Sequence, residues 1–216
     1  MSTARPGTGN RLERRKAQTR RKFLDAARAM LADGSAATAS IQDITEAADV
    51  GFGSFYNHFS SKTELFEAAV ADVMEEMGEL LDKLSSTVED PAAAFAQSVR
   101  LAGRLAHARP QVAQIFVRHG LATYIGSSEG LAPRALRDIS AGVTAGRFRT
   151  GNVKLALACV AGSLLATQQL ALSDPDFADD AVYDQLAEQL LVMLGLDAEE
   201  AHRLATLPLP DTASLD

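Results

Sequence analysis

Apolar residues recur at spacings of three and four along most of this 216-residue chain, and such spacing predicts amphipathic helices. In the segment 12–32, for example, Phe23, Ala27 and Met30 fall on one face of a helix. The composition agrees, because the chain has 39 Ala and 27 Leu but only 12 Val and 5 Ile. We therefore expect an all-α fold and do not expect a β-sheet.

Turn and capping residues divide the chain into separate helices. Asp33-Gly34 ends the first, because Gly tolerates the left-handed conformation common after a helix. Ser40 caps the second, and Ser61 with Glu64 has the S-x-x-E spacing of a capping box for the fourth. We expect helices over 12–32, 41–48, 52–59, from Ser61 to near Leu84, and over 91–107, 110–119, 131–145, 153–172, 178–194 and 198–207.

Positive and negative charges are divided unevenly along the chain. Residues 1–62 carry ten Lys and Arg against six Asp and Glu, whereas residues 63–216 carry 11 against 22. A basic head on an acidic body is typical of a protein whose head alone binds a polyanion, although charge alone also allows a solvated basic tail. We expect a flexible arm over 1–10, a DNA-binding head over 11–60, a helical body over 61–207 and a frayed tail over 208–216.

Two features bear on the cellular compartment. The single cysteine, Cys159, excludes an internal disulfide framework, and 1–21 is polar and basic without a secretory signal. Residues 155–173 are nineteen residues without a charge, close to the length of a membrane span, but Ser163 and Gln168 interrupt them. We expect a cytoplasmic protein without membrane contact, in which this helix lies between two protein layers, for example at a subunit interface.

Two short helices joined by Asp49-Val50-Gly51 have the spacing of a helix-turn-helix, whose second helix enters the major groove of DNA. Phe55 and Phe59 are four residues apart and form the inward face of that second helix. The residues expected to face outward are Phe52, Gly53, Ser54, Tyr56, Asn57 and His58. Hydroxyl and imidazole groups can donate to phosphates, and Asn57 can pair with an adenine edge.

The segments Ser40-Ile41-Gln42-Asp43-Ile44 and Val50 to Leu65 resemble the DNA-binding head of TetR-type repressors. The resemblance covers about 18–66. It implies that phosphates are held by Ser40, Tyr56, His58 and Lys62, and that Gln42, Phe52, Gly53 and Asn57 lie near base edges. The family usually has Gly where Asp49 stands, and Asp tolerates the same left-handed turn.

The resemblance also implies a homodimer and a small-molecule effector that enters the body. The helices 153–172 and 178–194 would pair with their copies in a four-helix bundle, and two heads would read a palindromic site. Their apolar stripe could equally be core of the single chain: Ala156, Val160, Leu164, Val182, Leu186, Leu190 and Met193. Candidate effector contacts, each of which could instead be ordinary core or surface, are Phe95, Val99, Leu105, His107, Phe116, His119, Tyr124, Ile125 and Cys159.

The sequence matches the motifs of other classes of function poorly. Gly126-x-Ser128-x-Gly130 has the spelling of a hydrolase nucleophile elbow, but no strand is expected before it and the only later histidine is His202. We expect no cofactor and no metal, because no ligand cluster has the required spacing. The sequence predicts a ligand-responsive DNA-binding transcriptional regulator, most simply a repressor. The alternative is a helix-turn-helix protein that binds DNA without a ligand.

Overall fold

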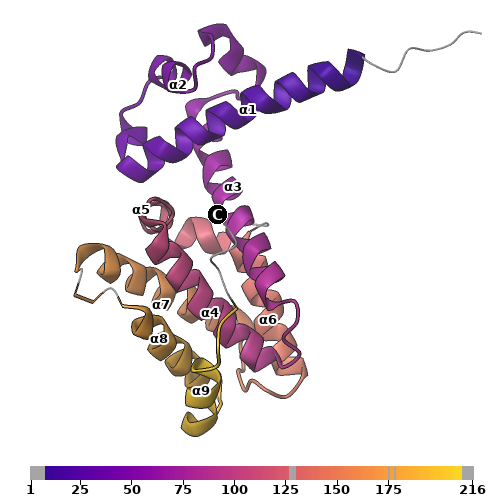
Figure 1. Ribbon diagram of the computed structural model, residues 1–216, viewed down its shortest axis with the longest axis vertical. Helices are drawn as coiled ribbons and strands as arrows, with labels where there is room; N and C mark the ends of the chain where they lie inside the picture. Colours follow the sequence, from indigo (N-terminus) through magenta and orange to yellow (C-terminus); the bar gives the residue numbers. More distant parts are fainter. Residues whose placement is uncertain (1–7, 127–129, 175, 178, 211–216) are drawn as a thin grey trace, which may run out of the picture. The chain divides into compact units, whose positions relative to one another are not determined.

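The computed structural model describes the backbone of 8–126, 130–174, 176–177 and 179–210, and the side chains of the same ranges except 8–10 and 119–126. Within these residues the chain is helical and has no strand, which confirms the predicted all-α fold (Figure 1). The chain divides into two compact units, Met1–Asp72 and Val73–Asp216, which we call the head unit and the body unit. Their boundary lies inside a helix, later than the boundary at 60 expected from the sequence.

The head unit contains the expected short helices and also a three-residue 3-10 helix that was not expected. Its elements are α1 (Thr8–Asp33), η1 (Ser35–Ala37), α2 (Ile41–Ala47), η2 (Phe52–Asn57) and the first part of α3 (Lys62–Ser85). The backbone of 8–10 is helical, so α1 begins earlier than the predicted arm allowed, and η2 is a 3-10 helix. Asp49 has a φ of 51°, the left-handed turn expected between the two short helices.

The body unit contains the rest of α3 and six further helices among the described residues. They are α4 (Pro91–Ala108), α5 (Pro110–Gly126), α6 (Leu131–Thr144), α7 (Val153–Ser173), α8 (Asp180–Met193) and α9 (Ala198–Ala205). Helix α5 continues beyond the predicted end at His119. Residues 127–129 of the expected loop and 211–216 of the expected tail lie outside the described residues.

Capping side chains fix several helix starts. Ser40 Oγ accepts from the backbone N–H of Asp43, whose carboxylate accepts from the N–H of Ser40, so the predicted cap is a complete capping box. These bonds from Ser40 lower the pKa of Asp43. The predicted box at α3 is only half right: Ser61 Oγ accepts from the N–H of Glu64, but the Glu64 carboxylate accepts from Ser60, at 2.7 Å from its N.

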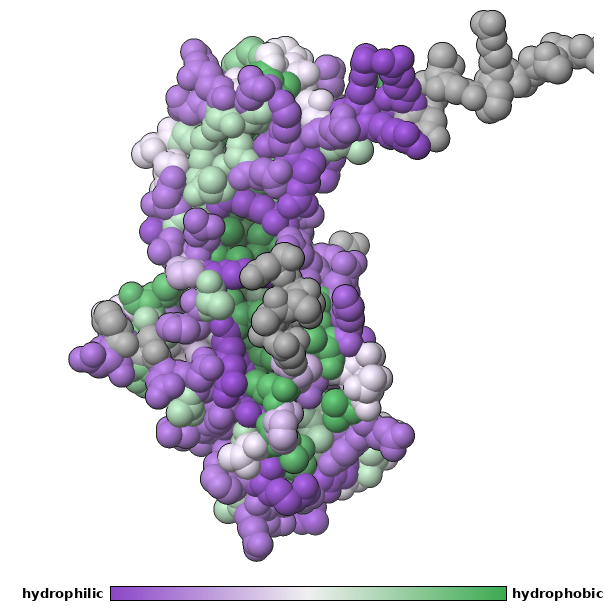
Figure 2. Space-filling model, viewed as in Figure 1, coloured by the Kyte–Doolittle hydropathy of each residue, from purple (hydrophilic) through white to green (hydrophobic). Residues whose placement is uncertain are grey.

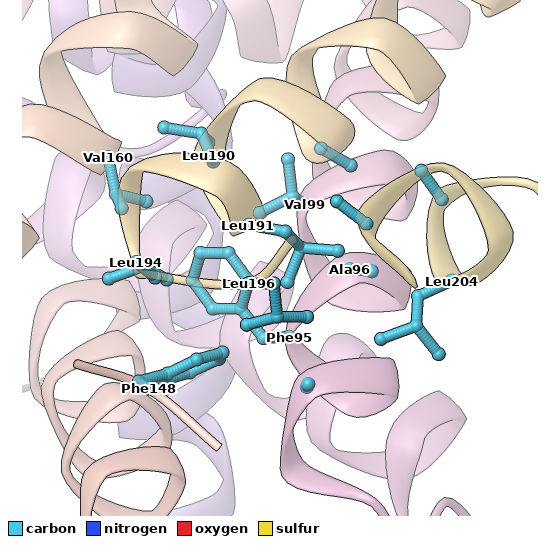
Figure 3. Packing of buried hydrophobic residues seen from close by; sticks show 14 of the residues in the cluster. Phe95, Ala96, Val99, Phe148, Val160, Leu190, Leu191, Leu194, Leu196 and Leu204 are labelled. Carbon is cyan, nitrogen blue, oxygen red and sulfur yellow. The ribbon is translucent and has the colours of Figure 1, made fainter. Parts of the chain in front are cut away.

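The core of the body unit joins α4, α6, α7, α8 and α9 (Figure 3). The rings of Phe95 and Phe148 meet edge to face, with centroids 5.5 Å apart. Gly142 makes room for this pair, because a Cβ there would lie 2.1 Å from the Phe148 ring. Of the predicted apolar stripe, this core includes Ala156, Val160, Leu186 and Leu190.

Helix α7 is long and apolar enough to cross a membrane, with a mean hydropathy of 1.6 over its most apolar window. A core helix passes the same test of length and composition. Helix α7 contacts α4, α5, α6 and α8, and Val160 and Ala161 on its inner face are buried. That face is therefore part of the body core.

The core of the head unit is an aromatic cluster. Phe23 of α1 and Phe55 of η2 are fully buried, and their rings meet edge to face at 5.6 Å. Phe59 is 3% exposed and lies 6.1 Å from Phe23 between ring centroids. The guanidinium of Arg20 lies 5.3 Å from the centre of the Phe59 ring. These contacts confirm the predicted inward face of the second short helix.

Phe55→Ala should destabilise the head unit by about 3–5 kcal/mol, because it removes a fully buried ring and leaves a cavity. Phe52→Ala is the matched control, since Phe52 lies three residues earlier on η2 and is 54% exposed. Its effect on the free energy of unfolding should stay within about 0.5 kcal/mol. Urea unfolding followed by circular dichroism measures both, and equal losses would contradict this account of the head core.

Candidate nucleic-acid interface and body cavity

The outer face of η2 is aromatic and polar. Phe52 is 54% and Tyr56 58% exposed, and their ring centroids lie 6.4 Å apart. Gly53 and Asn57 are exposed, and a Cβ on Gly53 would meet nothing within 4 Å. Ser54 is half-buried. The structure thus turns Phe52, Gly53, Tyr56 and Asn57 outward as the sequence predicted.

His58 departs from the prediction that it faces outward. It is half-buried, its ring lies 5.8 Å from the ring of Phe23, and its Nδ1 is buried without a hydrogen-bond partner. Burial lowers the pKa of His58, and the positive charges of Lys16 and Arg20 lower it further. A buried N–H without a partner is costly, so the neutral ring keeps its proton on Nε2, from which it can donate.

Three further residues predicted to contact DNA have partners inside the head unit. The Ser40 hydroxyl donates to Asp43 Oδ2 at 2.7 Å, so its hydrogen is already in use. The exposed Gln42 donates from Nε2 to Glu46 at 2.9 Å. The half-buried Lys62 donates from Nζ to the Ala39 carbonyl at 3.0 Å, and an ammonium group has two more hydrogens to offer.

Exposed cations line the first half of α1. Arg11, Arg14, Arg15 and Lys16 are exposed and form no ion pair with the described side chains. The hydrophilic residues of this helix form a continuous strip in Figure 2. Towards the end of the helix the pattern changes, because Arg28 pairs with Asp72 of α3 at 2.5 Å. The head unit therefore carries positive charge that its own carboxylates leave uncompensated.

The body unit contains a cavity of about 320 Å³. Its walls are mostly apolar and come from α3, α4, α5, α6 and α7. The structure brings three of the predicted contacts together in this wall, namely Phe95, Val99 and Phe116, all of them buried. The volume and the apolar lining are those of a small-molecule site.

Other predicted contacts lie elsewhere. His107 is exposed in the last turn of α4, and Cys159 is exposed on the outer face of α7, one position before the buried Val160, so neither lines the cavity. Leu105 is buried but is also absent from the wall. The side chains of His119, Tyr124 and Ile125 lie outside the described residues.

A charged patch interrupts the apolar wall. Arg134 donates from Nε to Asp82 at 2.7 Å and from Nη2 to Glu75 at 2.6 Å. Arg137 donates from Nη2 to the other oxygen of Asp82 at 2.7 Å and from Nε to Asp138 at 2.9 Å. Asp82, Arg134, Arg137 and Asp138 all line the cavity. This patch was not predicted from the sequence, because charged residues on an amphipathic helix are expected to face solvent.

The surroundings shift the pKa values of Asp138 and Asp82 in opposite directions. Burial raises the pKa of Asp138, against the effect of the bond from Arg137. Burial also acts to raise the pKa of Asp82, but the bonds from Arg137 and Arg134 outweigh it and lower that pKa. Among the described residues, the second oxygen of Asp138 has no hydrogen-bond donor. This oxygen is an acceptor left open in the cavity wall.

Gln168 of α7 is the other polar residue of interest in the wall. It is 6% exposed, and its Oε1 is buried without a hydrogen-bond partner. The sequence showed Gln168 only as an interruption of an uncharged stretch. Among the described residues, no group of His, Cys, Asp or Glu is placed to hold a metal ion.

The exposed surfaces of α7 and α8 include apolar and small side chains beside the charges of Lys154 and Asp180. On α7, Leu155 is 62% and Leu170 50% exposed, and a Cβ on Gly162 between them would meet nothing within 4 Å. On α8, Val192 and Met193 are more than 40% exposed. Met193 is therefore the member of the predicted stripe that lies on this surface, whereas Leu164 and Val182 are half-buried.

Comparison with known proteins agrees with both units. Residues 23–69 match the bacterial regulatory proteins of the tetR family, and residues 90–206 match the tetracyclin repressor-like C-terminal domain. The chain belongs to the TetR family. Together these matches make it a DNA-binding transcriptional regulator, and members of this family are generally not enzymes.

Similar solved structures cover nearly the whole chain. RolR in complex with resorcinol is 34% identical with a TM-score of 0.74, covering 93% of this chain and 100% of that chain. RolR without ligand is 33% identical with a TM-score of 0.71, covering 89% and 99%. A regulator from Shewanella sp. PV-4 is 17% identical with a TM-score of 0.73, covering 83% and 99%, and shares the fold. A comparison with curated proteins found no match.

The pKa of His58 should lie below its ordinary value of 6.5, so that the ring gains its proton only at lower pH. Since the folded head disfavours the charged ring, its stability should fall as the pH drops from 6.5 towards the folded pKa. An NMR titration of the His58 ring measures the midpoint. Lys16→Gln should raise it, whereas Lys154→Gln on the body should leave it unchanged. A midpoint at or above 6.5 would contradict the burial of this ring.

Proposed function

We propose that this TetR-family regulator is a cytoplasmic repressor that binds a palindromic operator as a homodimer and releases it when a small molecule fills the body cavity. The observation that carries this proposal is the outer face of η2 beside the uncompensated cations of α1. An exposed aromatic and amide face on a short helix has no part in the head core. Contact with a DNA groove accounts for it.

The predicted contact residues of the head have different roles on DNA. Tyr56, Lys62 and Nε2 of His58 donate to phosphates, and the cations of α1 add attraction that is independent of sequence. Asn57 and Gln42 pair with base edges, and Phe52 packs against a thymine methyl group. Gly53 and Ser54 keep the surface close to the groove, and Ser40 acts by holding the start of α2.

The homodimer is supported by the exposed apolar side chains of α7 and α8. Homodimers and repression are typical of the family. The small residues Cys159, Gly162 and Ala166 recur along α7 at spacings of three and four, which allows two helices to approach closely. Pairing two copies would cover Leu155, Leu170 and Met193 and place two heads on one palindromic site.

The effector is an uncharged hydroxylated aromatic molecule of the size and chemistry of resorcinol. RolR, 34% identical over nearly the whole chain, has been solved in complex with resorcinol. The cavity offers aromatic and aliphatic walls for a ring and the charged patch for its hydroxyl groups. The guanidinium groups of Arg134 and Arg137 already face the carboxylates of Glu75, Asp82 and Asp138, so this patch offers no uncompensated cation to an anionic ligand.

Tyr56→Ala should weaken binding to all DNA sequences by a similar factor, because phosphate contacts carry no sequence information. Asn57→Ala should relax the preference for one base pair, at a cost of about 1–3 kcal/mol. Fluorescence anisotropy on an operator selected from a random DNA library measures both against scrambled DNA. Operator affinity that stays constant between about 50 and 200 mM salt would contradict the proposed interface.

A matched pair of lysines gives the control for the salt dependence. Lys62→Ala removes a phosphate contact and should reduce the slope of log affinity against log salt by about 1. Lys154→Ala removes the same charge from the surface of the body and should leave the slope unchanged. Equal changes in slope for the two variants would remove Lys62 from the interface.

A further inference from the structure

Gln168 leaves a polar atom unsatisfied in the interior of the body unit. The residue is 6% exposed, and its Oε1 has no hydrogen-bond partner. A buried acceptor without a donor costs about 1–3 kcal/mol relative to one that is paired. The other residues that α7 contributes to the cavity wall are Val160, Ala161, Leu164 and Leu165. A leucine at 168 would match them, so the amide needs a reason other than packing.

The neighbouring residue shows that this arrangement is specific to position 168. Gln169 is exposed and donates from Nε2 to Ser173 Oγ at 3.2 Å, so its amide is satisfied outside the cavity. Gln168 lies in the wall of the 320 Å³ cavity, where a bound molecule is the group that could supply a donor. Asp138 presents a second open acceptor in the same wall.

We propose that Gln168 is a specificity-determining residue, whose amide oxygen accepts a hydrogen bond from one hydroxyl of an uncharged aromatic effector while Asp138 accepts from another. This inference rests on the proposed function, since it assigns the contacts of the same cavity. The cavity then selects molecules with two hydrogen-bond donors. Ethers lack the donors, and carboxylates add negative charge beside Asp82 and Asp138, where three carboxylates with Glu75 already face two guanidinium groups.

Isothermal titration of the full-length protein tests this assignment with three probes: resorcinol, 1,3-dimethoxybenzene and 3-hydroxybenzoate. The wild-type protein should bind resorcinol most tightly and each of the other two at least about tenfold more weakly. Gln168→Leu should weaken resorcinol binding by about tenfold or more, since one hydrogen bond is lost. Gln169→Leu is the matched control and should bind resorcinol within about twofold of the wild type.

Thermal unfolding without a ligand separates a binding role from a structural one. Gln168→Leu removes an unsatisfied buried acceptor, so the unfolding midpoint should stay constant or rise. A structural role would lower it together with the affinity. Gln168→Met keeps an unbranched side chain and also lacks the amide, so it should reproduce the loss of resorcinol binding even if the leucine variant packs poorly.

Three results would overturn the assignment of Gln168 while leaving the proposed repressor intact. In the first, both Gln168 variants bind resorcinol as tightly as the wild type does. In the second, both variants lose affinity and their unfolding midpoints fall as well. In the third, the wild-type protein binds 1,3-dimethoxybenzene as tightly as resorcinol. If the wild type binds none of the probes but still binds operator DNA, both the effector class and the role of Gln168 are wrong. If it also fails to bind operator DNA, the proposed function is wrong as well.

Discussion

Burial of Phe55 and Phe59 against Phe23 is the contact on which the function of the head depends. Phe55 of η2 and Phe59, two residues after it, hold this short helix against α1, and they determine which residues remain on the other side. Phe52 and Tyr56 then remain more than half exposed. The chain thus stabilises a small unit and presents a reading surface through the same helix. Without this aromatic cluster, the exposed residues would have no fixed geometry to offer to a groove.

Helix α3 gives the chain a continuous element that belongs to both units. Its beginning is tied within the head unit by the bond from Lys62 to Ala39 and by the ion pairs of Asp72 with Arg21 and Arg28. Its end, with Met77 and Asp82, forms part of the cavity wall in the body unit. An effector that favours one arrangement of this helix changes DNA affinity only through its differential affinity for the two states. We expect this difference in effector affinity to arise at Asp82, because both arginines of the charged patch contact it.

The helix-turn-helix could be predicted from sequence because its signals are local. The spacing of Phe55 and Phe59, the cap at Ser40 and the turn at Asp49 act within a few residues of one another. His58 was misplaced because η2 ends at Asn57, and His58 follows it with a φ of −122° and a ψ of −35°. Its ring lies 5.8 Å from that of Phe23 in the head core. Similarly, a glutamate at position 64 can reach the N–H of Ser60 as well as that of Ser61. The S-x-x-E pattern does not determine which of these two N–H groups it accepts from.

The polar part of the cavity could not be predicted in this way. Arg134 meets Glu75 and Asp82 across 59 and 52 positions of sequence, and no local pattern reports such a pairing. From the sequence of its own helix alone, each of these charged residues is predicted to face solvent. Phe95, Val99 and Phe116 were found because apolar side chains are expected inside. His107 and Cys159 were chosen for their chemistry, and the rotation of α4 and α7 places both on the surface.

The coupling between the cavity and the reading face is tested most directly by titrating resorcinol into the preformed complex of the full-length protein with its fluorescently labelled operator. As resorcinol saturates the protein, the anisotropy should fall to the value of free DNA. The total change in anisotropy should be the same for every operator half-site spacing that the protein binds. A complex whose operator affinity is unaffected by resorcinol that calorimetry shows to be bound would contradict this coupling.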